Sequence, residues 1–194
     1  MSGTHSDAVI SRRVRALETL LEERGVIGPT VLDEALDAFL AGATPLNGAR
    51  VVARAWTDPE FKERLLADGT SAVAELGYSA GGVQPQRLRV VENTEDTHNV
   101  VVCTLCSCYP VRLLGPSPGW YKSEAYRSRV VREPRAVLAE FGFTLPPDTE
   151  ITVWDSSAET RYMVLPRRPT TGSLREEDLT AMVTRNALIG TAPL

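Results

Sequence analysis

Apolar side chains in the first 77 residues recur every three or four positions, the spacing that gathers them on one face of a helix. The pattern predicts helices over residues 10–21, 32–40, 48–56 and 61–67 and a short one that ends at Leu76. Gly25 and Gly77 follow two of these segments and are typical helix stops. Asp58 followed by Pro59 is typical of a helix start, because the aspartate caps the first turn and the proline ring fits it. We therefore expect a helical N-terminal arm over residues 1–77.

Beyond Gly77 the pattern changes to short apolar runs, which favour β-strands. We expect strands over residues 88–91, 100–102, 151–153 and 162–165. Helical spacing returns over residues 123–131, 134–141 and 173–183. Such a mixture is typical of the α+β class. We therefore predict that residues 78–194 form a layered α+β domain with a small, mostly antiparallel sheet.

The N-terminal arm has two interpretations that the sequence leaves open. Amphipathic helices attached to a modest core often pack on a partner chain. They can equally fold back on their own domain and cover its surface.

Composition and charge narrow the class of protein. The apolar fraction is 43%, the charged fraction 24% and the net charge −4, all ordinary for a soluble globular protein. The arginines are scattered, so we expect no nucleic-acid partner. No apolar run approaches the roughly 20 residues of a membrane span. The polar N-terminus lacks the apolar core of a signal peptide, so we expect no membrane association and a cytoplasmic location.

All three cysteines of the chain, Cys103, Cys106 and Cys108, lie within six residues. An odd number of cysteines at this spacing cannot form a disulfide framework. In a reducing compartment such a cluster indicates metal or redox chemistry. A strand would point successive side chains to opposite faces, so we expect these residues on a tight loop that leaves the strand over residues 100–102. We call residues 103–108 the cysteine loop.

The spacing of the cysteine loop suggests a site with five donors: three sulfurs and the backbone nitrogens of Ser107 and Cys108. Thiolates and deprotonated amides favour a trivalent transition metal such as cobalt or iron. Zinc is an alternative, although it prefers four tetrahedral ligands. In the simplest alternative, the three cysteines pack as small buried apolar groups.

The stretch from Val101 to Pro110 resembles the metal-binding motif of nitrile hydratase α subunits, and the chain as a whole resembles the cobalt-type members of that family. The resemblance covers most of the chain from about residue 13. Further stretches that carry it are residues 47–56, 91–94, 98–99, 120–123, 126–129, 154–159 and 161–166.

This resemblance implies that residues 78–194 are a metal-binding catalytic domain whose sheet carries the cysteine loop. It implies one cobalt(III) ion per chain, held by Cys103, Cys106, Cys108 and the backbone nitrogens of Ser107 and Cys108. Thr104 stands where iron-type members usually carry serine, which makes iron(III) the second choice. Cys106 would be oxidised to a sulfinate and Cys108 to a sulfenate, while Cys103 would remain a thiolate.

The same resemblance implies hydration of a nitrile to an amide, with the metal as Lewis acid. Cys108, Ser107 and Gln84 would be the catalytic residues, with the Cys108 sulfenate acting as nucleophile or as base. Gln84 could equally be an ordinary loop residue. The partners implied are one or more β-type subunits, whose arginines would hold the oxidised sulfurs, and an activator protein that inserts cobalt.

Four further residues have roles that are open. Glu159 and Arg161 match positions that orient metal ligands, but they could equally form a surface ion pair. Val111 and Arg112 stand where the family usually has tryptophan and proline at the substrate pocket. The change suggests a bulkier or more polar nitrile, as in the nitrile hydratases that act on nucleoside antibiotics such as toyocamycin.

Two other functions compete with nitrile hydration. The metal-bearing subunit of thiocyanate hydrolase is similar throughout, and the positive charge of Arg112 would suit an anionic substrate. A function of another class is a non-catalytic zinc protein or a thiol redox sensor that uses the same three cysteines.

Overall fold

A computed structural model describes residues 3–79, 86–106, 108–170, 172 and 174–194, with side chains described from Ala8 onward. The chain divides into two compact units, Met1–Ala41 and Gly42–Leu194. This division lies earlier in the chain than the one predicted at residue 77. The helices between residues 45 and 75 belong to the second unit, because their apolar side chains are part of its core.

The first unit consists of two helices, α1 (Gly3–Glu23) and α2 (Val31–Ala41). Gly25 ends α1 as predicted and adopts a positive φ of 68°. Its backbone N–H donates to the carbonyl of Glu22, which closes the last turn. No residue of α2 is buried.

The second unit begins with three helices, α3 (Pro45–Thr57), α4 (Pro59–Ala67) and α5 (Gly69–Glu75). Each starts on a side chain that accepts a hydrogen bond from the first turn: Thr44, Asp58 and Asp68. The cap predicted at Asp58 is confirmed. Most of α3 is buried, including Val51, Val52 and Ala53, so this helix is central to the core.

Four strands follow the predicted positions: β1 (Arg87–Glu92), β2 (Thr97–Val102), β3 (Glu150–Asp155) and β4 (Thr160–Leu165). They form two parallel pairs, β1 with β4 and β2 with β3. The α+β class is confirmed, but the prediction of a mostly antiparallel sheet is wrong. A parallel strand buried on both faces reads as a continuous apolar run, and Val100–Val102 of β2 is such a run.

The short connection between β1 and β2 does not make a hairpin, and polar side chains explain why. The carboxamide of Asn93 accepts a hydrogen bond from the backbone N–H of Asn99, 2.8 Å away. The side-chain nitrogen of Asn99 donates to the carbonyl of Glu92 at 2.8 Å. These side chains therefore form hydrogen bonds with backbone groups at the junction. Each of the two strands pairs instead with a strand that begins after residue 149.

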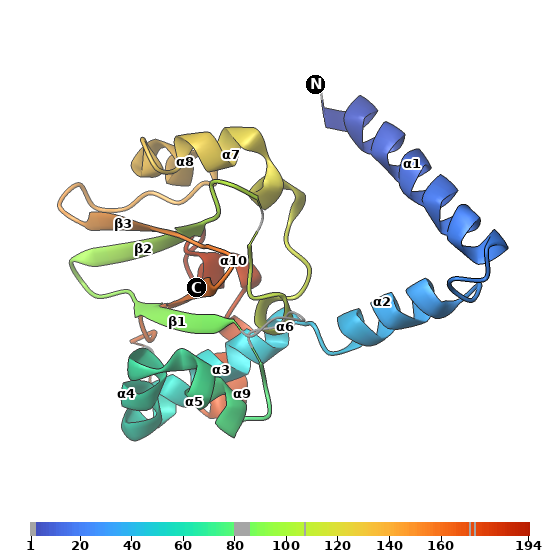
Figure 1. Ribbon diagram of the computed structural model, residues 1–194. Coiled ribbons are helices and arrows are strands. Elements are labelled where there is room, and N and C mark those ends of the chain that lie inside the picture. The colour runs from blue at the N-terminus through green and yellow to red at the C-terminus, as the bar shows by residue number, and fades with distance from the viewer. Residues whose placement is uncertain (1–2, 80–85, 107, 171, 173) are drawn as a thin grey trace. The chain divides into compact units, whose positions relative to one another are not determined.

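Helices cover the strands of the second unit from both sides (Figure 1). Helices α4 and α5 pack on β1, whereas α8 (Pro134–Glu140) packs on β3. Between β2 and α8 the chain forms α6 (Val111–Leu114), η1 (Gly119–Lys122) and α7 (Glu124–Arg129). The chain ends with α9 (Glu176–Met182), packed on α3, and α10 (Arg185–Ile189).

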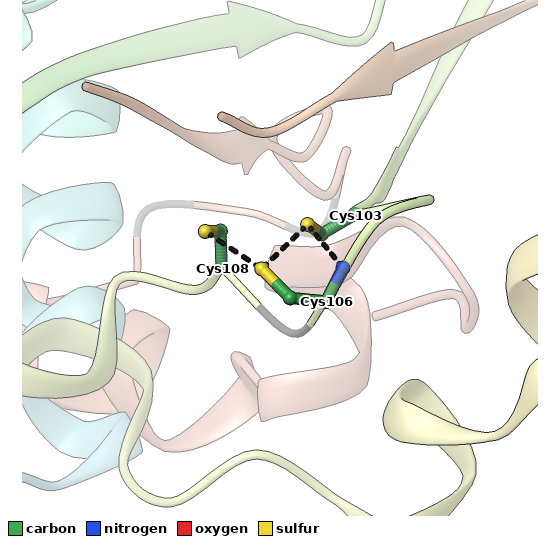
Figure 2. A group of neighbouring side chains, drawn as sticks. All are labelled: Cys103, Cys106 and Cys108. Atoms are coloured by element: carbon green, nitrogen blue, oxygen red, sulfur yellow. Dashed lines mark hydrogen bonds between the residues drawn. The ribbon is translucent and has the colours of Figure 1, made fainter. Parts of the chain in front are cut away.

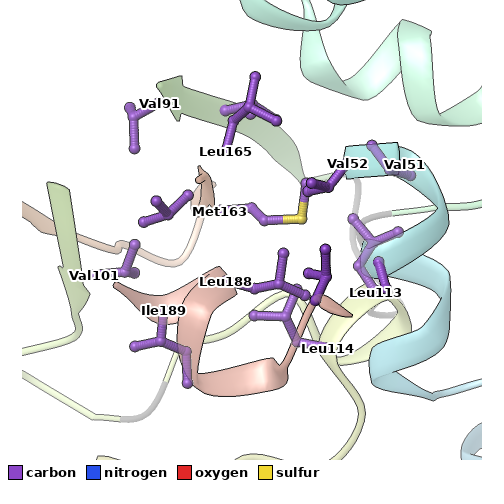
Figure 3. Packing of buried hydrophobic residues seen from close by; sticks show 14 of the residues in the cluster. Val51, Val52, Val91, Val101, Leu113, Leu114, Met163, Leu165, Leu188 and Ile189 are labelled. Carbon is purple, nitrogen blue, oxygen red and sulfur yellow. The ribbon is translucent and has the colours of Figure 1, made fainter. Parts of the chain in front are cut away.

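The core of the second unit lies where α3, α6 and α10 meet the strands (Figure 3). Met163 of β4 points into the space between Val52 of α3 and Leu188 of α10. All three side chains are fully buried. None of the helices in the described ranges combines the length and apolarity needed to cross a membrane.

Candidate metal centre

The cysteine loop leaves the end of β2 directly after Val102, as predicted. The sulfur of Cys106 lies 3.4 Å from that of Cys103 and 3.2 Å from that of Cys108. All three sulfurs lie within 4.8 Å of one another. Figure 2 shows the Cys106 sulfur between the other two sulfurs and joined to each of them by a dashed line. The backbone N–H of Cys106 also points to the Cys103 sulfur, at 3.4 Å, so the turn is closed without a disulfide.

The three thiols differ in their access to solvent. Cys103 is 1% exposed, Cys108 is half-buried and Cys106 is exposed. Burial is the largest cause, followed by the hydrogen bond with Cys106, of a rise in the pKa of the Cys108 thiol to about 12. Without a cation this thiol stays protonated at neutral pH, so metal binding must release its proton.

The first half of the cysteine loop is attached through Thr104. Its backbone N–H donates to one carboxylate oxygen of Asp155 at 2.9 Å, and its hydroxyl donates to the other at 2.6 Å. Its carbonyl accepts a hydrogen bond from the guanidinium of Arg127 at 3.2 Å. All three polar groups of Thr104 are therefore bonded.

Two tyrosines hold the ends of the cysteine loop. The Tyr126 hydroxyl donates to the carbonyl of Val101 at 2.7 Å, and the Tyr121 hydroxyl donates to the carbonyl of Cys108 at 3.0 Å. Both tyrosines are buried, and burial holds the pKa of each hydroxyl well above its usual range. Both hydroxyls are therefore protonated at neutral pH and donate hydrogen bonds there.

The structure brings together some of the predicted site residues and leaves others undecided. Cys103, Cys106 and Cys108 form one cluster. Ser107 and Gln84 lie outside the described residues, so their proposed roles stay predictions. Val111 begins α6 and packs partly buried against the core. The guanidinium of Arg112 lies beside Gly42, in the segment that precedes α3.

Glu159 lies in the turn before β4, and Arg161 is the second residue of that strand. The Glu159 carboxylate is exposed and accepts a hydrogen bond from the Ser157 hydroxyl at 2.8 Å, which lowers the pKa of that carboxyl group. Arg161 is 8% exposed and donates to the carbonyl of Ser157. The positive charge of Arg161 opposes the rise in the pKa of Cys108, so this residue acts on the thiol cluster. A role for either residue in orienting the metal stays a prediction.

Sequence reasoning assigned no role to Asp155, Arg127, Tyr121 and Tyr126. Each lies in a stretch that carries the family resemblance, but nothing in the local pattern shows that it faces the cysteine loop. Asp155 reaches the loop because the parallel register places it opposite Val102, the last residue of β2. That register became visible only in the structure.

The three sulfurs fit a thiolate-preferring metal ion. They are the soft donors that transition metals such as cobalt, iron and zinc prefer. They come from one short loop and already face one another. The fold and this cluster define a mixed helix and sheet protein with a thiolate metal site at the end of a parallel strand.

Comparison with known proteins identifies the family. A family model described as nitrile hydratase, alpha chain, matches residues 8–192. The low-molecular weight cobalt-containing nitrile hydratase subunit alpha of Rhodococcus rhodochrous is 53% identical over 186 residues, which cover 95% of this chain and 89% of that protein. The chain therefore belongs to the nitrile hydratase alpha-chain family.

Two further comparisons bear on the metal and the reaction. A solved structure of a double mutant of the iron-type nitrile hydratase from Comamonas testosteroni Ni1 superposes with a TM-score of 0.89 and 44% identity, over 96% of this chain and 91% of that one. Thiocyanate hydrolase subunit gamma of Thiobacillus thioparus is 47% identical over 158 residues, which cover 76% of this chain and 65% of that protein.

Proposed function

We propose that this chain is the metal-bearing α subunit of a cobalt nitrile hydratase, which adds water to a nitrile and releases the amide. The observation that carries the proposal is the convergence of three thiol sulfurs within 4.8 Å on one loop of a chain that belongs to this family. The relatives with about half of their residues identical to this chain include three named as cobalt-containing, which supports cobalt over iron.

The residues proposed to hold one cobalt(III) ion are Cys103, Cys106 and Cys108, together with the backbone nitrogens of Ser107 and Cys108. Thr104 supports cobalt, because iron-type members usually carry serine there. The match to an iron-type structure keeps iron(III) as the second choice. When bound, a trivalent ion would polarise the nitrile or make a bound water more acidic.

The unequal exposure of the cysteines supports the proposed oxidation pattern. Oxidation of a thiolate depends on access to the oxidant, here dioxygen. Cys106 and Cys108 are accessible, and they are the residues proposed to gain two oxygens and one oxygen. Cys103 is shielded by the core and is proposed to stay a thiolate. The Cys108 sulfenate would then serve as a nucleophile toward the nitrile carbon or as a base that takes a proton from water. In either case the net reaction places both protons of one water molecule on the amide nitrogen.

A β-type partner subunit is part of the proposal. Leu105, at the tip of the cysteine loop, is 88% exposed, and the adjacent Cys106 is exposed as well. We propose that the partner covers this tip of the cysteine loop. We propose that the partner supplies arginines to the oxidised sulfurs, that an activator protein inserts cobalt, and that the enzyme works in the cytoplasm.

The most direct test combines elemental analysis with intact-mass measurement of the purified chain. We expect one cobalt per chain and a mass increase of three oxygens. Replacing Cys106→Ala should abolish metal retention, because it removes one of the three sulfurs. Stoichiometric zinc with unmodified cysteines would instead support a non-catalytic zinc or thiol-switch protein.

The second candidate is thiocyanate hydrolase, which is favoured by the sequence similarity and by the cation at Arg112. Assays of the chain together with its β-type partner separate the two functions. Hydration of nitriles without breakdown of thiocyanate supports the proposal. The reverse result would assign the chain to thiocyanate hydrolysis.

The natural nitrile is proposed to be larger or more polar than simple aliphatic ones, because Val111 stands where the family usually has a tryptophan.

A further inference from the structure

The first half of the cysteine loop contains only Thr104 and Leu105 between two proposed metal ligands. The Leu105 side chain is 88% exposed, so it contributes little packing that would hold the loop in one shape. Thr104, in contrast, uses its N–H, its hydroxyl and its carbonyl in hydrogen bonds to other parts of the fold. The position of this half of the loop therefore depends on what holds Thr104.

We propose that Asp155 is a positioning residue for the metal centre: it fixes Thr104 and thereby sets the spacing of Cys103 and Cys106 before the metal arrives. The inference rests on the proposed function only in so far as the three cysteines bind a metal ion. The hydrogen bonds found for Asp155 among the described residues go to Thr104. Asp155 acts through Thr104, while Arg127 holds the carbonyl of Thr104 through its guanidinium.

The backbone explains why the carboxylate stands in the right place. In the parallel pair of β2 and β3, Asp155 is the register partner of Val102, so both strands end side by side at the start of the cysteine loop. The backbone N–H of Ser156 also donates to the carbonyl of Val102 at 2.7 Å, which continues the ladder to the same point. The end of β3 therefore places the Asp155 carboxylate where it can accept hydrogen bonds from the N–H and the hydroxyl of Thr104.

The hydrogen bonds to Asp155 have a consequence for metal affinity. The N–H of Cys106 points to the sulfur of Cys103 at 3.4 Å, so the turn after Thr104 already brings these two donors together. A loop that is already in its binding shape loses less conformational entropy when the ion binds. Residues that orient metal ligands typically change affinity by about 10–100-fold when they are removed.

The test measures affinity of the full-length chain for Co(II) alone, under anaerobic and reducing conditions, by thiolate-to-cobalt absorption. We expect Asp155→Ala to weaken binding by at least about 10-fold and to shift the absorption bands, because the sulfurs are no longer held in one arrangement. Asp155→Asn can still accept from the N–H and donate to the hydroxyl, so it should restore most of the affinity. Asp148→Ala, which removes an exposed carboxylate at the other end of β3, is the control and should match the wild type.

A second variant guards against misfolding. Thr104→Val removes only the hydroxyl and keeps the shape of the side chain, so it should weaken Co(II) binding by a smaller factor than Asp155→Ala. The double variant should be no weaker than Asp155→Ala alone, because both changes break the same contact. Thermal unfolding of the metal-free variants identifies any variant that is not folded.

The proposal is overturned if folded Asp155→Ala binds Co(II) within about twofold of the wild type, or if the two substitutions add independently. If Asp155→Ala does not fold, unchanged binding by Thr104→Val overturns it. A purified wild-type chain that carries stoichiometric zinc and unmodified cysteines would contradict the proposed function. The same series of variants measured with Zn(II) would then still decide the role of Asp155.

Discussion

Two helical regions of this chain look alike in sequence and differ in burial. Both α2 and α3 carry apolar residues at helical spacing. No residue of α2 is buried, whereas Val51 and Val52 of α3 are completely buried. The comparison teaches that an amphipathic pattern indicates that a face needs a cover, but it does not identify the cover. For α3 the cover comes from the chain's own second unit, including α6, α9 and α10.

The first unit keeps several large apolar side chains at the surface. Ile10, Leu17 and Leu36 are each more than half exposed. For the first unit, both predicted alternatives therefore stay open: its helices pack on a partner chain, or they pack on the rest of their own chain. The contrast between the two regions can be tested by substitutions in the buried core of the second unit and in the exposed helices of the first.

The largest effect is expected for Leu188→Ala in α10. Leu188 is completely buried beside Met163, so its truncation removes apolar contacts and leaves a cavity. We expect a loss of about 2–5 kcal/mol in the free energy of unfolding, measured by urea denaturation of the metal-free chain. A loss below about 1 kcal/mol would mean that the core around Leu188 is not closely packed and would contradict the contrast with the exposed first unit.

A smaller effect is expected when the pH is lowered. His98 is buried, accepts a hydrogen bond from Asn93 at 3.1 Å and donates to the carbonyl of Gly190 at 2.7 Å. Burial lowers the pKa of His98 below its ordinary value of 6.5. The unfolded chain therefore takes up a proton first, so this part of the stability is complete above about pH 6.5 and declines as the pH falls toward the lowered value.

Urea denaturation at about pH 7.5 and about pH 5.5 measures this decline, with His98→Gln as the comparison because glutamine does not titrate in that range. The variant should be less stable than the wild type at the higher pH and should lose less on acidification. An equal acid sensitivity of both chains would show that His98 does not contribute to it.

The smallest effect is expected for Leu17→Ser in α1. This side chain is 56% exposed, so replacing it removes little buried surface. The free energy of unfolding of the second unit should change by no more than about 0.5 kcal/mol. A loss comparable to that of Leu188→Ala would erase the contrast between the two regions and would show that α1 stabilises the second unit.

Several features of this protein were determined by the sequence alone because they depend on neighbours along the chain. The helix start at Asp58 and the stop at Gly25 follow from local backbone chemistry, and the structure confirms both. The cysteine loop directly after an apolar strand was also predictable, because three sulfurs within six residues need a turn to meet. The family resemblance predicted the metal and the reaction, which local chemistry could not do.

Only the tertiary structure decided how distant segments pair. β1 and β2 each pair in parallel with a strand that begins after residue 149, and the side chains of Asn93 and Asn99 bond backbone groups at the junction where a hairpin was possible. The helix α10 escaped prediction because it is only five residues long, although Thr184 caps it and Gly190 ends it. Asp155 meets Thr104 through the register of two strands, and pairing energies between residues so far apart leave no periodic trace in the sequence.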